Sequence, residues 1–266
     1  MRGALLALSL SALAVQGIAA ESATGRNADA GNAERRSTSP ARYAAIERAA
    51  WQDDSRTHPL ADALVGAARA GEADRVRTLI GEGALPNARD SHGDRPLAAA
   101  AGAGRVEAAR LLLQRGANPD DKGAQGRTPL ALAVAGGHVQ IVRHLLRYGA
   151  RPDARSANGA SPVHEAARFG RSDALALLLA AGADASQLDA SGLHPLAIAA
   201  ARGDLASIEQ LLAAGVAADL PDRQGRTARF WARRENQADA EALLAARSAA
   251  RPDDAGYASS AGVTGR

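Results

Sequence analysis

The chain has 266 residues, of which 46% are hydrophobic and 3% aromatic, and its formal net charge is +3. Alanine supplies much of the apolar share, which favours close packing of helices and argues against a bulky β-sandwich or barrel core. The absence of cysteine excludes a disulfide framework, and Lys122 is the only lysine, so the excess of arginine indicates a GC-rich genome rather than a nucleic-acid-binding protein.

The N-terminus has the pattern of a secretory signal peptide. Arg2 precedes an apolar run from Ala4 to Val15, and small residues follow up to Ala20. This run is too short to cross a bilayer comfortably, and no later apolar stretch has the length of a membrane span. We therefore expect cleavage near Ala20 and a mature protein in the periplasm of a bacterium or secreted from it.

Three further segments flank the regular part of the chain. Residues 21–39 are small and polar, which predicts a flexible linker. Residues 40–58 are predicted to form an N-terminal capping helix and a connector, because Tyr43, Ile46 and Ala50 recur at helical spacing. Residues 247–266 return to linker composition and are expected to be a disordered tail.

The unit from Gly126 to Asp153 predicts two short helices. The hydroxyl of Thr128 can cap the first helix, a proline follows where no N–H is needed, and Gly137 ends this helix. The second helix is expected over residues 138–148, with one apolar face made by Val139, Val142, Leu145 and Leu146. Neither helix can bury its apolar face alone, so the unit needs neighbours of the same shape.

Those neighbours exist, because the unit recurs every 33 residues over residues 59–246. An apolar residue near the start of each first helix marks the period: Leu64, Leu97, Leu130, Val163 and Leu196. The last unit differs, since it places Arg229 at the marker position and Arg233 and Arg234 where small residues are expected. Polar residues allow a stack to end in water, so we expect five repeats and a polar C-terminal capping unit.

The segments SPVHEAARFG at 161–170 and TPLALAVAGGH at 128–138 carry a capped helix start, a helix-ending glycine and small residues between them. With the leucine pairs and glycines that follow, they resemble the motif of the ankyrin-repeat family. The resemblance covers residues 59–246 and implies an all-α solenoid of stacked helix pairs with β-hairpin-like fingers between repeats. It brings no catalytic residues with it.

Candidate catalytic and metal-binding residues are few. The resemblance implies that His164 and His138 serve hydrogen bonding between repeats, while His194 stands at a helix-opening threonine position and His92 in a loop tip. No histidine pair has metalloprotease spacing or a neighbouring set of carboxylates, and no nucleophile elbow or phosphate-binding loop is found. We expect no enzymatic activity, no metal and no cofactor.

The resemblance implies that partners bind the fingers and the outward side of the first helices. Candidate residues there are mostly basic: Arg89, Lys122 and Arg155 in the fingers, Arg127 before a helix start, and Arg168, Phe169 and Arg202 on first helices. We expect the groove to be deepest at Phe169, because an aromatic anchor ringed by arginines is typical of protein interfaces. The alternative is that the arginines only solvate the surface and that Phe169 is a scattered exposed side chain.

The function that these observations favour is a non-enzymatic, monomeric protein-binding module of the periplasm, whose groove holds an acidic or amphipathic partner. An alternative is an immunity or protective protein that blocks one toxin or stress-linked enzyme. Nucleic-acid binding is disfavoured by the signal peptide and by the lack of aromatic residues among the arginines. A hydrolase with an unrecognised site is the remaining alternative.

Overall fold

The computed structural model describes residues 60–249. The expected signal peptide, linker and capping helix lie before this range, and most of the expected tail lies after it, so these predictions fall outside the described residues. Between residues 60 and 249 the chain forms twelve α-helices and no β-strand. In the same range no helix is both long enough and apolar enough to cross a membrane.

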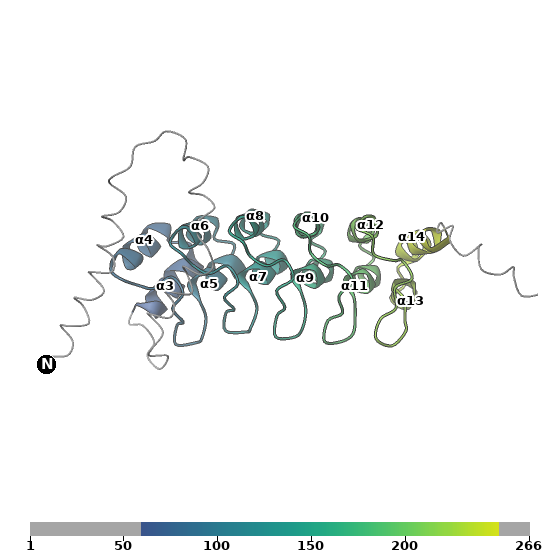
Figure 1. Cartoon of the computed structure of the whole chain (residues 1–266), viewed down its shortest axis with the longest axis horizontal. Coiled ribbons are helices and arrows are strands. Elements are labelled where there is room, and N and C mark those ends of the chain that lie inside the picture. The colour runs from purple at the N-terminus through teal and green to yellow at the C-terminus, as the bar shows by residue number, and fades with distance from the viewer. Residues whose placement is uncertain (1–59, 250–266) are drawn as a thin grey trace, which may run out of the picture. The chain divides into compact units, whose positions relative to one another are not determined.

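The helices form two layers (Figure 1). The first helices of the six units are α3 (Ala61–Ala70), α5 (Pro96–Gly102), α7 (Pro129–Gly136), α9 (Pro162–Phe169), α11 (Pro195–Arg202) and α13 (Ala228–Arg234). The second helices are α4 (Ala73–Gly81), α6 (Val106–Gln114), α8 (Val139–Arg147), α10 (Ser172–Ala180), α12 (Leu205–Ala213) and α14 (Ala238–Ala249). Each helix contacts its own partner and the equivalent helix of the next unit. The predicted all-α solenoid is confirmed.

Local signals start and stop the first helices as the sequence predicts. The hydroxyl of Thr128 accepts a hydrogen bond from the backbone N–H of Ala131 at 3.2 Å, and Pro129 occupies the first turn of α7. Gly137 ends the helix with φ +74°, a conformation in which glycine carries no Cβ penalty. At α11 the cap is a histidine, since Nδ1 of His194 accepts from the N–H of Ala197 at 3.1 Å.

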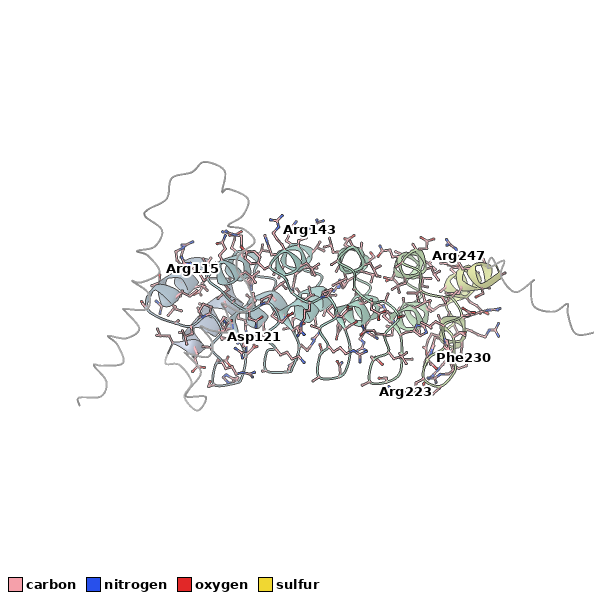
Figure 2. The ribbon with its side chains drawn as sticks, in the orientation of Figure 1. Arg115, Asp121, Arg143, Arg223, Phe230 and Arg247 are labelled. Atoms are coloured by element: carbon pink, nitrogen blue, oxygen red, sulfur yellow. The ribbon has the colours of Figure 1, made fainter. Side chains whose placement is uncertain are left out.

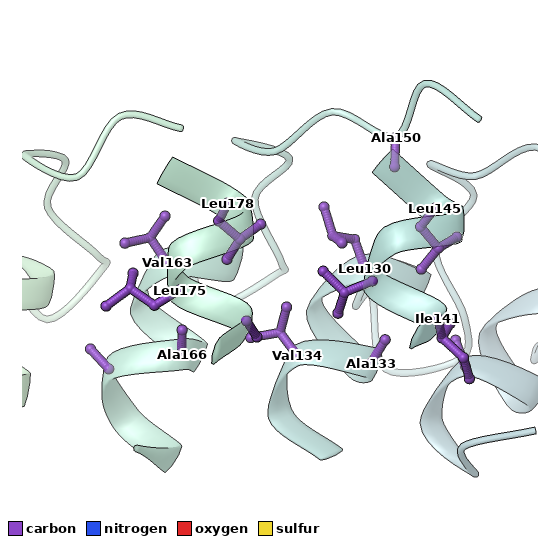
Figure 3. Packing of buried hydrophobic residues seen from close by; sticks show 14 of the residues in the cluster. Leu130, Ala133, Val134, Ile141, Leu145, Ala150, Val163, Ala166, Leu175 and Leu178 are labelled. Carbon is purple, nitrogen blue, oxygen red and sulfur yellow. The ribbon is translucent and has the colours of Figure 1, made fainter. Parts of the chain in front are cut away.

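The core lies between the two layers and runs from unit to unit (Figure 3). In α8 the fully buried apolar residues are Ile141, Val142 and Leu145, whereas Val139 and Leu146 are half-buried. The predicted apolar face of this helix was therefore partly wrong. Ile141 and Leu145 are four residues apart, so they project from one side of the helix, and Val139 and Leu146 lie at the edges of that side.

Each pair of units is joined by a finger, as the resemblance implies. Five fingers are closed by a hydrogen bond from a backbone N–H to the carbonyl four residues later, at 2.8 to 3.0 Å: Asp90 to Asp94, Gly123 to Arg127, Ser156 to Ala160, Asp189 to Leu193 and Asp222 to Arg226. Adjacent fingers also touch, since the N–H of Ala157 donates to the carbonyl of Gly126 at 3.2 Å. A Cβ at Gly126 would lie 2.9 Å from that of Ala157, so this approach requires glycine.

The last unit ends the stack with charged residues. Arg229 and Arg233 both pair with Glu241 of α14, at 3.4 and 2.5 Å, and the side chain of Arg229 is 48% exposed. The marker position that is apolar and buried in the other units is thus polar here, as expected of a terminal unit. Helix α14 extends to Ala249, past the expected end of the repeat region at residue 246.

Candidate protein-interaction surface

The fingers and the outward side of the first helices together make one face, called here the finger-side face. One position of the first helices recurs at the repeat period, and from α5 to α13 it is occupied in turn by Ala99, Leu132, Glu165, Ile198 and Trp231. Ala99 and Leu132 line a cavity on this face together with finger residues. The chemistry therefore changes along the face, from small and apolar at α5 to charged at α9 and aromatic at α13.

Two of the predicted binding arginines are held by buried carboxylates. The Nη2 atom of Arg127 lies 3.4 Å from Oε2 of Glu165, and Nη2 of Arg168 donates to Oδ2 of Asp189 at 3.2 Å. The side chains of Glu165 and Asp189 are only 4% and 3% exposed. The sequence analysis missed these pairs, because the two acids lie in other helices or fingers. Arg127 and Arg168 therefore balance internal charges and are not free cations.

The other predicted arginines lie along the fingers and first helices. Arg155 donates to Oε1 of Gln187 at 3.2 Å and to a carbonyl of the next finger, and Arg202 lies against Gly170. Arg89 is exposed and makes a long bond of 3.5 Å within its own finger.

Most of the predicted residues remain available on this face. Phe169 is 43% exposed at the end of α9. Lys122 is exposed and pairs with no carboxylate among residues 60–249. With exposed Arg89, Arg155 and Arg202, which form no ion pair among residues 60–249, they are the members of the predicted set that a partner can reach without displacing an internal ion pair.

A cavity of about 340 Å³ lies between α5, α7 and the fingers that precede them. Its lining residues are Arg69, Asp94, Ala98, Ala99, Gly102, Ala103, Gly123, Ala124, Gln125, Arg127 and Leu132. Of the predicted set only Arg127 lines this cavity, which lies in the units before the one that carries Phe169. The physical reason for the cavity is that alanine and glycine occupy most of these positions and leave the space unfilled.

Two histidines are buried between repeats. Nδ1 of His164 accepts the backbone N–H of Ser161 at 3.2 Å, so Nε2 carries the proton and donates to the carbonyl of Leu193 at 3.2 Å. Burial lowers the pKa of His164, and it lowers the pKa of His194, whose Nε2 bonds the carbonyl of Leu220 at 2.9 Å. The inter-repeat bond implied for His164 is confirmed. His138 instead places its ring against Gly104 of the preceding unit.

One histidine does have carboxylate neighbours, contrary to the sequence analysis. Ligand atoms of Asp62, Asp90 and His92 lie within 4.8 Å of one another. Hydrogen bonds from the N–H and the hydroxyl of Ser91 to Asp62 lower the pKa of that carboxyl. Asp90 in turn accepts the N–H groups of His92 and Asp94, at 3.0 and 2.7 Å. The two carboxylates thus hold the finger hairpin together.

The last unit carries an aromatic and cationic cluster that the sequence analysis did not identify. The rings of Phe230 and Trp231 meet edge to face at 5.7 Å, and the guanidinium of Arg226 lies 4.3 Å from the centre of the Trp231 ring. Arg234 lies 5.0 Å from the same ring. Phe230 is 44% exposed at the end of the stack (Figure 2), because no further unit covers the position that is buried in the preceding first helices.

The repeat geometry agrees with the comparisons with known proteins. A family model of ankyrin repeats, containing three copies, matches residues 64–156, 118–189 and 163–254. No curated protein matches the chain. Because the matches overlap and together extend over well more than half of the 266 residues, the chain belongs to the ankyrin-repeat family, whose stacks are protein–protein interaction modules.

Proposed function

We propose that the protein is a non-enzymatic module of the bacterial periplasm that holds one partner protein on its finger-side face. The observation that carries this proposal is the way in which successive units are locked together. Nε of Arg105 donates to the carbonyl of Arg69 at 3.1 Å, and Nε of Arg171 donates to the carbonyl of Ala135 at 3.2 Å. Together with the bonds between fingers, these contacts pre-form the face, which limits the ordering cost of association.

The chemistry of the face favours an acidic or amphipathic partner. Exposed Phe169 offers an apolar contact, and exposed Arg89 and Lys122 add positive charge in the fingers. Arg127 and Arg168 add little charge, because each already faces a buried carboxylate. The partner is therefore expected to combine a modest apolar contact with acidic groups at the rim, where charge mainly raises the association rate.

A photo-crosslinking side chain at position 169 tests this proposal in the full exported chain. Position 148 is the matched control, because Tyr148 is 41% exposed and ends the second helix α8, in the layer away from the fingers. We expect a discrete crosslinked partner from position 169 and none from position 148. Equal crosslinking from the two positions, or no crosslinked partner from either, would contradict the proposal.

The periplasmic location is tested separately. The segment from Arg2 to Ala20 has the order of a signal peptide, namely a basic residue, an apolar run and small residues. We expect the mature chain to begin at Glu21 and to be recovered in the periplasmic fraction. Mass spectrometry of the purified protein measures its N-terminus, and an intact Met1 or Arg2 in the native host would contradict export.

A further inference from the structure

Two fingers of similar sequence differ at two of five positions, and one of these differences removes a carboxylate. The finger at 222–226 reads DRQGR, and its counterpart three repeats earlier, at 123–127, reads GAQGR. In the later finger Asp222 is 5% exposed and accepts the N–H groups of Gln224 and Arg226 at 2.8 and 2.9 Å. It also accepts Nε of Arg226 at 2.9 Å and the indole N–H of Trp231 at 3.0 Å. This point in a finger is thus a binding position for a carboxylate.

In the earlier finger Gly123 removes that carboxylate while the hairpin remains. The N–H of Gly123 still donates to the carbonyl of Arg127 at 3.0 Å. Among residues 60–249, however, the backbone N–H groups of Gln125 and Arg127 find no acceptor. Nε of Arg127 is buried and also has no hydrogen-bond partner. Buried donors in proteins are normally paired, so the unpartnered Nε of Arg127 marks an incomplete site, and the two N–H groups beside it can also donate.

The finger at 156–160 shows that such a loss can be compensated within the chain. There Ser156 replaces the aspartate, and Oδ1 of Asn158 accepts one of the two N–H groups, that of Ala160, at 3.2 Å, while the buried Oγ of Ser156 has no partner. The finger at 123–127 has Gln125 in place of Asn158, and the side chain of Gln125 is exposed at the wall of the cavity. The acceptor must therefore come from elsewhere.

The cavity described above opens onto these donors. Its apolar wall is made by Ala98, Ala99 and Leu132. Asp94 lies against Gly123 and has both oxygens occupied, since Oδ2 faces Nη2 of Arg69 at 2.8 Å and Oδ1 accepts the N–H of Arg95 at 2.9 Å. Internal charges are thus balanced, with Arg69 against Asp94 and Arg127 against Glu165. Exposed Lys122, next to Gly123, supplies the excess positive charge.

We propose that this cavity binds a carboxylate side chain of the partner protein at the unpartnered Nε of Arg127, with an adjacent aliphatic side chain of the partner against Ala99 and Leu132. The inference rests on the proposed function, and it names the partner as a peptide segment in which an acidic residue stands beside an aliphatic one. A carboxylate suits the site because it only accepts hydrogen bonds and has two oxygens for a guanidinium and two amides.

The first test uses 4-methylpentanoate, a carboxylate with a branched aliphatic end, and its neutral counterpart 4-methylpentanamide. Each is titrated into the ¹⁵N-labelled full chain while the Nε–H of Arg127 and the N–H of Gln125 are followed by NMR. We expect saturable shifts with the carboxylate only, and no shift at the Nε–H of Arg226, which already has its carboxylate. No saturable shift, or equal shifts with the amide, overturns the proposal.

The second test supplies the missing carboxylate from within the chain. A Cβ at Gly123 would lie 2.5 Å from Oδ1 of Asp94, so Gly123→Asp is combined with Asp94→Ala, and Asp94→Ala alone is the matched control. We expect the affinity for 4-methylpentanoate to be roughly tenfold or more lower in the double variant than in Asp94→Ala. If the double variant does not fold, Arg127→Gln takes its place. Unchanged affinity in the variant that folds overturns the proposal.

These outcomes separate the inference from the proposed function. We expect the double variant to lose the crosslink from position 169 that the parent chain gives. A crosslink that persists unchanged contradicts the carboxylate site and leaves the protein-binding function standing. If the parent chain gives no crosslink, the proposed function fails, and the titration still decides whether the cavity binds a carboxylate.

Discussion

At the scale of single residues, the buried histidines link the repeat motif to the pH dependence of stability. Burial lowers the folded-state pKa of His164 and His194 below the ordinary value of 6.5, so between the two pKa values the unfolded chain binds more protons. The free energy of unfolding should therefore fall as the pH drops below 6.5, by up to about 1.4 kcal/mol per pH unit for each histidine.

Urea unfolding at pH 7.5 and at pH 5.5 measures this effect. Replacement of both histidines, His164→Asn and His194→Asn, should lower stability at pH 7.5 and should flatten its dependence on pH between these values. An equally steep pH dependence in that double variant would assign the effect to other groups.

Two adjacent leucines of α8 give a prediction about packing. Leu145 is fully buried and Leu146 is half-buried, although both belong to the leucine pair that recurs in the second helices. Leu145→Ala should cost about 2–5 kcal/mol of unfolding free energy, because it leaves a cavity in a close-packed core. Leu146→Ala should cost clearly less. Chemical denaturation of the two variants checks this order, and equal losses would contradict the burial pattern.

At the scale of the element, the finger at 222–226 depends on one carboxylate. Burial disfavours the charged form of Asp222, but hydrogen bonds from the backbone of Arg226, the indole of Trp231, the guanidinium of Arg226 and the backbone of Gln224 outweigh it and lower its pKa to about 2. Asp222→Ala leaves these donors unpaired and should destabilise the chain by about 1–3 kcal/mol.

Hydrogen exchange locates this loss. The N–H groups of Gln224 and Arg226 should exchange faster in the Asp222→Ala variant, whereas those of the distant finger at 90–94 should not change. Because the folded pKa is lowered, the stabilisation by Asp222 is complete above pH 3.8 and disappears as the pH falls through about 2. Uniform acceleration in both fingers would mean global unfolding rather than a local role.

At the scale of the whole molecule, stability should be a sum over units and their interfaces. A chain that ends at Leu220 keeps the bond from His194 to the Leu220 carbonyl but loses the last finger, α13 and α14. It exposes the face of α11 that contacts α13. We expect a lower urea midpoint and a smaller m-value, because less surface is buried in the folded state. An unchanged midpoint would show that the last unit does not stabilise the stack.

On the finger-side face, the ion pairs and the cavity could not be predicted from the sequence. The positions of Arg127 and Arg168 near the fingers predict binding residues. No local pattern in the sequence indicates that Glu165 and Asp189 lie beside them. The cavity was also missed, since alanine and glycine carry no signal for a binding site. One difference could nevertheless be recognised in the sequence. GAQGR and DRQGR differ at the position where a carboxylate closes the later finger.

The sequence by itself determined the stack. Capping residues such as Thr128 and stop signals such as Gly137 act within one turn of helix, and the 33-residue period places each apolar face opposite another. Only the tertiary structure decided which charges are free and where the face is hollow. Arg127 meets Glu165 of the next unit, and the space beside Gly123 depends on residues from three helices and two fingers. Such contacts depend on long-range packing, which local residue patterns do not encode.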